Sequence, residues 1–359
     1  MPLDFALVGH QESWRAASDV LAVLRGPGLS PIPDDEVEDI LPWIPPRAVC
    51  RVEVRSVLGS KAHGIYIDSF IPPDRLDSCH LRENLGRVRG AAAYACREGA
   101  KIVSLGGFSS ILIEGNFDRL PDKRASVFTT GNTLTVAFIV QGMKKMCALE
   151  GRDLKTATLL VVGATGDVGS GCARCLAPQV GRVVLFARNL ERLQTLATEL
   201  TADGARVDVA TDLQSLPVHA NFVICAASLA SPSLLLDGIA PESIVCDAGY
   251  PKNLSPGCRG ARVFLGGLGQ VAAGMTCEPD ILRVLYRHRH VLHGCLLEGM
   301  VLALEGRFEP FSQGRGFITR ERVEMIEAIA ERHGVHLAPL CDGDGPLEQA
   351  ACQVEGLAG

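Results

Sequence analysis

The sequence predicts an α/β protein with a doubly wound parallel sheet, preceded by a second α/β domain and followed by helices. Three observations support this fold class. Of the 359 residues, 47% are hydrophobic and 21% are charged, which is typical of a globular chain with a substantial core. From about residue 156, short apolar strands alternate with helices, the pattern of a parallel sheet covered on both faces. A glycine-rich turn joins the first of these strands to the first helix.

The N-terminal part predicts strands and helices in a less regular order. FALVGH at 5–10 has the pattern of a short buried strand, and the helical period at 13–25 has Ser13 as its cap. After a Pro-rich acidic connector, CRVEVRSVLG and AHGIYIDSFI alternate like paired strands around a turn. A helix follows, then KIVSLGGFSSILI as a strand with a glycine interruption. TTGNTLTVAFIVQGMKKMCALEG is a long helix entered through hydroxyl residues that could cap it.

The rest of the chain predicts the regular sheet and the helices after it. Between the first helix, DVGSGCARCLAPQV, and a second, LERLQTLATELTADG, lies the strand RVVLFAR. Further strands are expected at RVDVA, NFVICAAS, SIVCDAGY and RVFLGGLG. One long helix is expected from about 279 to 306 and another over roughly 319–333.

The turn VVGATGDVGS gives the sheet its Rossmann character. Gly163, Gly166 and Gly169 stand between a strand and a helix, where glycines allow a tight turn, close approach of a pyrophosphate and close helix packing. In this context the turn predicts dinucleotide binding, although an unrelated α/β fold could also carry a Gly-rich turn. The cofactor-binding residues expected here and after later strands are Gly163, Thr165, Gly166, Asp167, Val168, Gly169, Ala227, Ser228 and Tyr250.

The second strand of this sheet favours NADP(H) over NAD(H). It ends without the Asp or Glu that would bind a ribose 2′-hydroxyl, and has Arg188, Asn189 and then Arg192 instead. A guanidinium suits a 2′-phosphate because it offers charge-assisted bonds, unless Arg188 simply faces solvent. The expected domains are an N-terminal α/β substrate domain at 1–150, an NADP-binding Rossmann domain at 151–278, a C-terminal helical segment at 279–340 and a flexible tail at 341–359.

Composition excludes several other classes of function. The net charge of −6 argues against a nucleic-acid partner, and the apolar stretches are too interrupted to read as transmembrane helices. The N-terminus lacks the pattern of a signal peptide, so we expect a cytoplasmic protein. The thirteen cysteines then predict reduced thiols, with Cys172 and Cys175 as packing residues. Neither HExxH nor a His–carboxylate cluster indicates a metal centre.

The sequence leaves the catalytic group open. None of the four tyrosines has Lys four residues later, which argues against the chemistry of short-chain dehydrogenases. Cys295 shares a core-like helical face with Leu292, Gly299 and Leu302, which indicates a buried inert thiol. The basic run RHRHVLH before it could instead lower the thiol pKa and make it a nucleophile.

Several motifs together resemble the long-chain acyl-[acyl carrier protein] reductases of cyanobacteria. They are LGGFSSI, FTTGNT, VVGATGDVGS, FARNLERL, DAGYPKN and GCLLEGMVLALEG, and the likeness covers nearly the whole chain in order. The resemblance implies that Cys295 accepts the acyl group, that the cofactor is NADPH, and that the product is a fatty aldehyde. It also implies an acyl carrier protein or coenzyme A thioester as substrate, and leaves open an aldehyde-consuming enzyme as a further partner.

The resemblance also gives candidates for the substrate cleft. Oxyanions form in both steps of such a reduction and need hydrogen-bond donors. The substrate-binding candidates are Ser109, Thr130, Asn132 and Thr133, whose alternative roles are helix capping and turn formation. The basic clusters at 82–89 and 283–290 could dock an acidic carrier protein.

Two other functions remain as alternatives. One is a non-covalent NADP-dependent dehydrogenase of a small carbonyl or alcohol, in which Cys295 only packs. The other is a non-enzymatic NADP(H)-sensing protein that keeps the Rossmann fold without catalysis. Acylation of Cys295 distinguishes the reductase from both.

Overall fold

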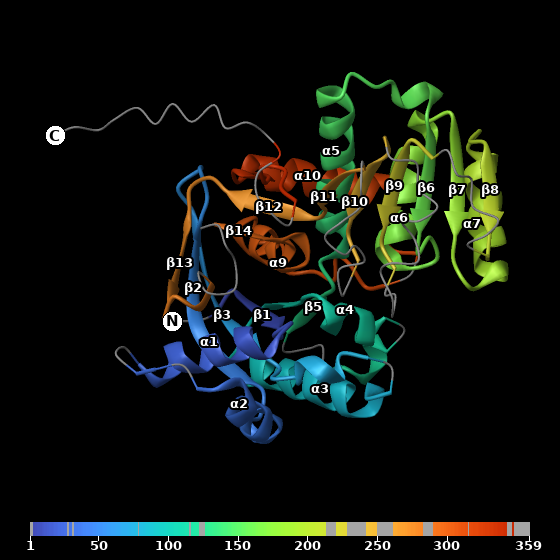
Figure 1. The fold of residues 1–359 in the computed structure, drawn as a ribbon. Helices are drawn as coiled ribbons and strands as arrows, with labels where there is room; N and C mark the ends of the chain where they lie inside the picture. The colour runs from blue at the N-terminus through green and yellow to red at the C-terminus, as the bar shows by residue number, and fades with distance from the viewer. Residues whose placement is uncertain are drawn as a thin grey trace.

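The structure is a computed structural model of the chain. It describes residues 3–26, 29–30, 32–77, 79–114, 116–121, 126–212, 220–227, 242–249, 261–282, 290–314, 316–342 and 347. Two six-stranded sheets and one three-stranded sheet organise these residues. In Figure 1 the first large sheet lies at the lower left and the second at the right, and the long helix α5 (Asn132–Leu149) stands between them.

The first sheet is mostly parallel, and β1 lies inside it. The strand order is β13-β2-β3-β1-β4-β5; β3, β1, β4 and β5 are parallel, and β2 pairs antiparallel with both β3 and β13. Along β1, Phe5 and Leu7 join the core that includes α9, whereas Ala6 and Val8 join a second core with α3 on the other face. The strands are β1 (Phe5–Gly9), β2 (Arg47–Arg55), β3 (Lys61–Asp68), β4 (Ile102–Leu105), β5 (Val127–Thr129) and β13 (Met275–Glu278).

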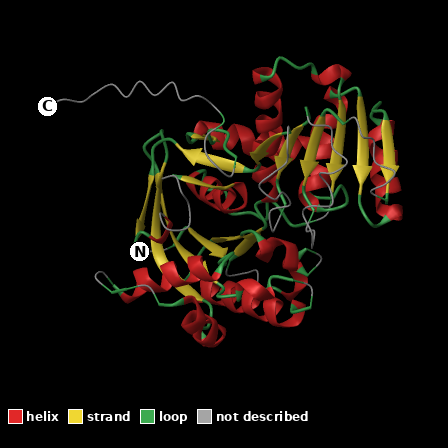
Figure 2. Cartoon of the chain, viewed as in Figure 1, coloured by secondary structure: helices red, strands yellow, loops and turns green. Residues whose placement is uncertain are grey.

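The second sheet confirms the predicted doubly wound fold. Its order, β11-β10-β9-β6-β7-β8, is parallel throughout and reverses at β6, as in dinucleotide-binding sheets. Figure 2 shows its strands side by side with helices beside them. The strands are β6 (Thr158–Val162), β7 (Arg182–Phe186), β8 (Val207–Ala210), β9 (Phe222–Cys225), β10 (Ile244–Asp247) and β11 (Arg262–Leu265).

Helices cover the sheets and connect them. α9 packs on the first sheet and against α5, and α5 in turn packs against α6 and α10. The other helices are α1 (Trp14–Arg25), α2 (Asp34–Ile40), α3 (Leu81–Arg97), α4 (Phe108–Ile113), α6 (Asp167–Leu176), α7 (Leu190–Ala202), α9 (Gly294–Leu304) and α10 (Arg320–Arg332). Short 3₁₀ turns occur at Leu41–Trp43, Pro73–Arg75, Phe117–Arg119, Leu154–Thr156 and Ala177–Gln179. No helix in the described ranges is long and apolar enough to cross a bilayer.

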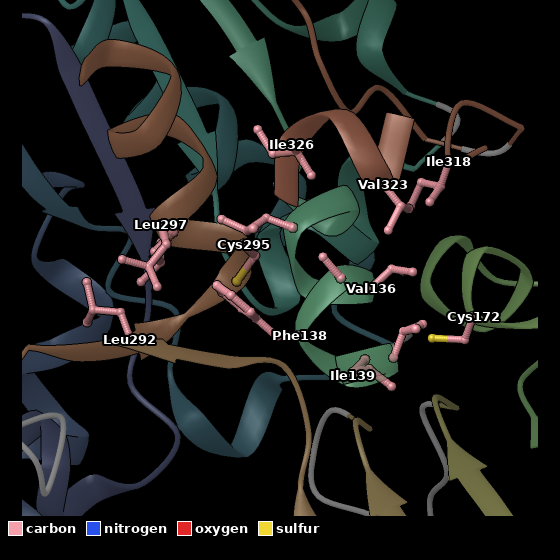
Figure 3. Packing of buried hydrophobic residues seen from close by; sticks show 14 of the residues in the cluster. Val136, Phe138, Ile139, Cys172, Leu292, Cys295, Leu297, Ile318, Val323 and Ile326 are labelled. Atoms are coloured by element: carbon pink, nitrogen blue, oxygen red, sulfur yellow. The ribbon is translucent and has the colours of Figure 1, made fainter. Parts of the chain in front are cut away.

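One continuous core runs through the interface between these helices. In Figure 3, Cys295 lies beside the side chains of α5, and Cys172 lies at the other side of the cluster. Cys172 and Cys175 are buried in this core, so their predicted packing role is confirmed. The cysteines that the structure describes are all free thiols.

The structure corrects three predicted elements. The single helix from 279 to 306 is wrong: β14 (Val291–His293) pairs antiparallel with β12 (Leu268–Val271), and α9 begins only afterwards. His290 has a φ of 64°, a left-handed conformation that no α-helix continues through. KIVSLGGFSSILI is a strand only as far as Leu105 and is helical from Phe108, and the acidic connector contains α2. β15 (Val335–Leu337) completes the three-stranded sheet.

Candidate active site

The candidate site lies where parallel strands of the first sheet end. His10 follows β1, Gly107 lies just after β4, and Gly131 lies just after β5. Cys295 occupies the first turn of α9, which packs on the same sheet. Because parallel strands end at one edge, these four residues are brought to one place, as in ligand sites of other open α/β sheets.

The Cys295 sulfur is surrounded by backbone donors. The N–H groups of Gly107, Leu296 and Cys295 itself are directed at Sγ, and they oppose the effect of burial on the thiol pKa. Burial prevails and, with a smaller contribution from the charge of Glu298 one turn along α9, raises that pKa to about 11. The thiol is therefore protonated at neutral pH, within a set of donors that can stabilise negative charge on sulfur or on an adjacent oxygen.

Two glycines allow the backbone around Cys295 to close up. Gly131 has a φ of 68°, and a Cβ there would lie 2.1 Å from the carbonyl oxygen of Cys295. Gly294 lies against α5, where a Cβ would come within 2.7 Å of the Thr135 Cα. A side chain at either position would push α9 away from the turn between β5 and α5.

Glu298 fixes α9 to that turn. Its side chain is fully buried and accepts hydrogen bonds from Thr129 Oγ1, from Ser312 Oγ at 2.9 Å and from the Leu134 N–H at 3.0 Å. Burial raises the carboxyl pKa, whereas these donors lower it. Together with Ser312 Oγ, which accepts the Thr133 N–H at 3.1 Å, Glu298 satisfies the first turn of α5.

The hydroxyl residues expected to line the cleft have different surroundings. Ser109 is fully buried, and its Oγ has no hydrogen-bond partner among the described residues. Thr133 Oγ1 is hydrogen-bonded to Ser312 Oγ at 2.6 Å, and Thr130 Oγ1 accepts the Asn132 N–H at 3.5 Å. Asn132 Nδ2 donates to Asp167 Oδ2 at 3.3 Å. Ser109 is thus the candidate with a hydroxyl to offer, while Thr130 and Thr133 shape the turn.

The glycine turn after β6 fits a dinucleotide. Gly163 has a φ of 81°, and a Cβ there would lie 2.8 Å from the Ala227 N, so the ends of β6 and β9 are in contact. A Cβ on Gly169 would lie 2.3 Å from the Gly163 oxygen, which explains the close packing of α6. Among the described residues, a Cβ on Gly166 would meet only the Gly163 oxygen, at 3.4 Å, where a pyrophosphate would approach the α6 N-terminus.

The predicted 2′-phosphate residues lie on the surface after β7. Arg188 and Arg192 are exposed. Asn189 has a structural task, since its Oδ1 accepts the Arg192 N–H at 3.0 Å and caps α7. Thr165 and Val168, in the glycine turn, are partly exposed. Ser228, Tyr250 and most of the basic run 283–290 lie outside the described residues.

The site of Cys295 and the glycine turn form one region. The bond from Asn132 to Asp167 joins the first turn of α5 to the first turn of α6. Gly131, next to Asn132, touches Cys295, and Gly166, next to Asp167, belongs to the dinucleotide turn. Cys295, with its backbone donors, is therefore joined in space to the Rossmann glycine turn through neighbouring residues of α5 and α6. This combination places the protein in the class of NAD(P)-binding oxidoreductases.

Comparison with known proteins identifies the family. The chain is 34% identical over 345 residues to the long-chain acyl-[acyl-carrier-protein] reductase of Synechococcus elongatus, covering 92% of this chain and 97% of that protein. The chain belongs to the family of long-chain acyl-[acyl-carrier-protein] reductases, which confirms the resemblance noted in the sequence. Residues 145–263 also match the family model of shikimate / quinate 5-dehydrogenases.

Other similarities are more limited. The aminotransferase PigE of a Serratia strain is 26% identical over 80% of this chain, which spans only 34% of that protein. The L-sorbose reductase of Gluconobacter frateurii, solved with NADPH and L-sorbose, is 18% identical over 26% of this chain and 52% of its own, with a TM-score of 0.24. A short-chain dehydrogenase of Sphingobium yanoikuyae, solved with NADPH, has a TM-score of 0.23, with 20% identity over 25% of this chain and 52% of its own. Structural similarity at this level carries no conclusion about this chain.

Sequence reasoning missed His10 and Glu298. His10 directly follows the first buried strand, and a polar residue at that place in an α/β fold is a usable signal. Glu298 stands in the apolar run GCLLEGMVLAL, where a lone carboxylate predicts a buried partner set.

Proposed function

We propose that this reductase converts a long-chain acyl thioester to a fatty aldehyde with NADPH, through an acyl group carried on Cys295. The observation that supports this most is the Cys295 sulfur, held by three backbone N–H groups beside the glycine turn. The substrate is an acyl carrier protein or coenzyme A thioester, in keeping with the relative from Synechococcus elongatus.

Acylation uses groups that the structure holds in place. The Cys295 sulfur attacks the thioester carbonyl, the bond from carbon to the carrier sulfur breaks, and the carrier leaves as a thiol. Once acylated, the sulfur no longer needs the Gly107 N–H, which can then donate to the acyl oxygen. The Ser109 hydroxyl, buried without a partner among the described residues, is the second donor in this proposal.

The cofactor is held by the second sheet. NADPH bound there would supply the hydride for reduction of the acyl group to the aldehyde, with Cys295 as the leaving thiolate. Gly163, Gly166 and the first turn of α6 receive the pyrophosphate, and the exposed Arg188 receives the 2′-phosphate. Because Cys295 is buried, the thioester is kept from water while it waits for reduction.

The carrier protein docks on a basic surface in this proposal. Arg82 and Arg89 on α3 are exposed and available for an acidic partner. Arg87 between them is not, since its guanidinium donates to the carbonyl oxygens of Pro42, Ile44 and Phe70.

Intact-mass measurement tests the proposal. The protein is incubated with a palmitoyl thioester without NADPH, and one acyl adduct is expected in the native chain and in Cys172→Ala, but none in Cys295→Ala. Addition of NADPH should remove the adduct and release aldehyde. Reduction of a small carbonyl that survives Cys295→Ala would instead support the non-covalent dehydrogenase, and NADPH binding without either reaction would support a sensor.

A further inference from the structure

His10 is a titratable side chain at the edge of the first sheet without a role in the reaction described so far. Its ring packs edge-on against Phe108, with 6.2 Å between the ring centroids. A Cβ on Gly107 would lie 2.8 Å from the His10 Cε1, so the imidazole lies against this glycine. The ring is only partly exposed, and burial lowers its pKa to about 4, which makes it a neutral base at neutral pH.

Gly107 also contacts the nucleophile. Its N–H donates to the Cys295 sulfur, while its Cα side meets His10. The imidazole and the thiol therefore flank the same residue, Gly107. Across one residue a proton can pass through a bridging water molecule.

Glu298, the buried carboxyl one turn along α9, is unsuited to accept the thiol proton. Glu298 is committed to Thr129, Ser312 and the Leu134 N–H, and its charge raises the Cys295 pKa. The resting pair of thiol and imidazole is neutral. Charge develops only when sulfur attacks, and the N–H groups of Gly107, Leu296 and Cys295 are then in place to stabilise it.

We infer that His10 is the general base and acid of acylation: its imidazole accepts the Cys295 proton as sulfur attacks the thioester and passes it to the departing carrier sulfur. One C–S bond forms and one breaks, a single proton moves from Cys295 through His10 to the carrier, and nothing is oxidised or reduced. The inference rests on the proposed function, because it requires Cys295 to be the acylated residue.

The test compares native protein with His10→Gln in single-turnover acylation without NADPH. With a palmitoyl thioester of an alkyl thiol, His10→Gln should be acylated about 10² to 10⁴ times more slowly. With a thiophenyl ester the loss should be smaller, since an acidic leaving thiol needs no proton. Added imidazole should restore part of the rate. His63→Gln is the matched control, because His63 is partly exposed on β3 of the same sheet.

The outcomes separate the two proposals. Acylation of His10→Gln at the native rate would overturn the role of His10 and leave the acyl-cysteine intact. Equal losses with both esters, without rescue by imidazole, would also overturn it, because a merely structural residue would act in that way. Absence of any adduct on the native protein would instead overturn the proposed function.

Discussion

The two sheet edges that meet in this protein are built in different ways. Around Cys295 the groups are buried. Glu298 and Ser312 are hydrogen-bonded to each other, and the backbone of Gly131 packs against Cys295. On the cofactor side Arg188 is exposed, and among the described residues a Cβ on Gly166 would meet only the Gly163 oxygen. The edge that holds Cys295 is thus prepared by packing before any ligand binds, whereas the cofactor edge offers exposed groups to a ligand. Substitutions at the first edge should change the fold and the reaction together, and those at the second should change affinity alone.

The largest effect is expected from Gly131→Val. A β-branched residue at a φ of 68° is strained, and its Cβ would overlap the Cys295 carbonyl oxygen. The free energy of unfolding should fall by about 3 kcal/mol or more, and the acyl adduct should disappear. Urea unfolding and intact mass measure the two effects. Gly59→Val is the control: its φ is 89°, but no described residue lies within 4 Å of the added Cβ. Equal losses in both variants would show that strain alone is responsible.

A smaller loss is expected from Glu298→Leu. The change leaves the Thr129 and Ser312 hydroxyls and the Leu134 N–H without their buried acceptor. Each such group costs about 1 to 3 kcal/mol, partly relieved by relaxation, so a total near 3 kcal/mol is expected. Glu298→Gln keeps an acceptor oxygen and should lose less. If denaturant unfolding finds the two variants equally stable, the network does not hold α9 in place.

The reactivity of Cys295 should depend steeply on pH. Because burial raises its pKa to about 11, the thiolate fraction increases about tenfold per pH unit up to that value. At pH 8 the residue should react with iodoacetamide about 100-fold more slowly than a thiol of pKa 9, if access is equal. Peptide mapping of alkylated protein between pH 7 and 10.5 gives the profile. A plateau below pH 9 would contradict the buried, protonated thiol.

The smallest effect belongs to the cofactor edge. Arg188→Ala should weaken NADPH binding about tenfold and leave NADH binding and the unfolding midpoint unchanged, since it removes one charged contact to phosphate. Fluorescence titration with both nucleotides measures this. Arg182→Ala at the start of β7 is the control, because that exposed side chain pairs with Asp208 instead. Equal weakening of NADH would show that Arg188 does not read the 2′-phosphate.

The same contrast explains what the sequence could predict. The second sheet could be predicted from local patterns. Each of its strands is a short apolar run, and Gly163 and Gly169 indicate the turn between β6 and α6. The edge that holds Cys295 depends on contacts between distant residues, such as the hydrogen bond between Thr129 and Glu298, which are 169 positions apart. Cys295 itself was found by family resemblance, because its helical period alone indicates core. His10 was not predicted because its neighbour Gly107, which lies after β4, is distant in the sequence.

Two strands, β13 and β14, were not predicted, for a related reason. β14 has only three residues, and its pairing with β12 rather than its own pattern makes it a strand. β13 lies in the range expected to belong to the Rossmann domain, yet it pairs with β2 of the first sheet. Such pairings are tertiary and leave little trace in periodicity.

The pairing of β13 with β2 has a consequence for how the chain is assembled. Residues 275–278 form the edge strand β13 of the first sheet, and residues 294–304 form the helix that places Cys295 on it. The unit begun by the first 150 residues is therefore completed only by residues that follow the whole second sheet. During synthesis the earlier unit must wait for the later one to emerge. The cofactor-binding segment is therefore inserted into the unit that contains the first sheet. The chain leaves that unit before the segment and rejoins it afterwards. That segment could therefore be exchanged for one with another nucleotide preference without altering the residues that surround Cys295 on the first sheet.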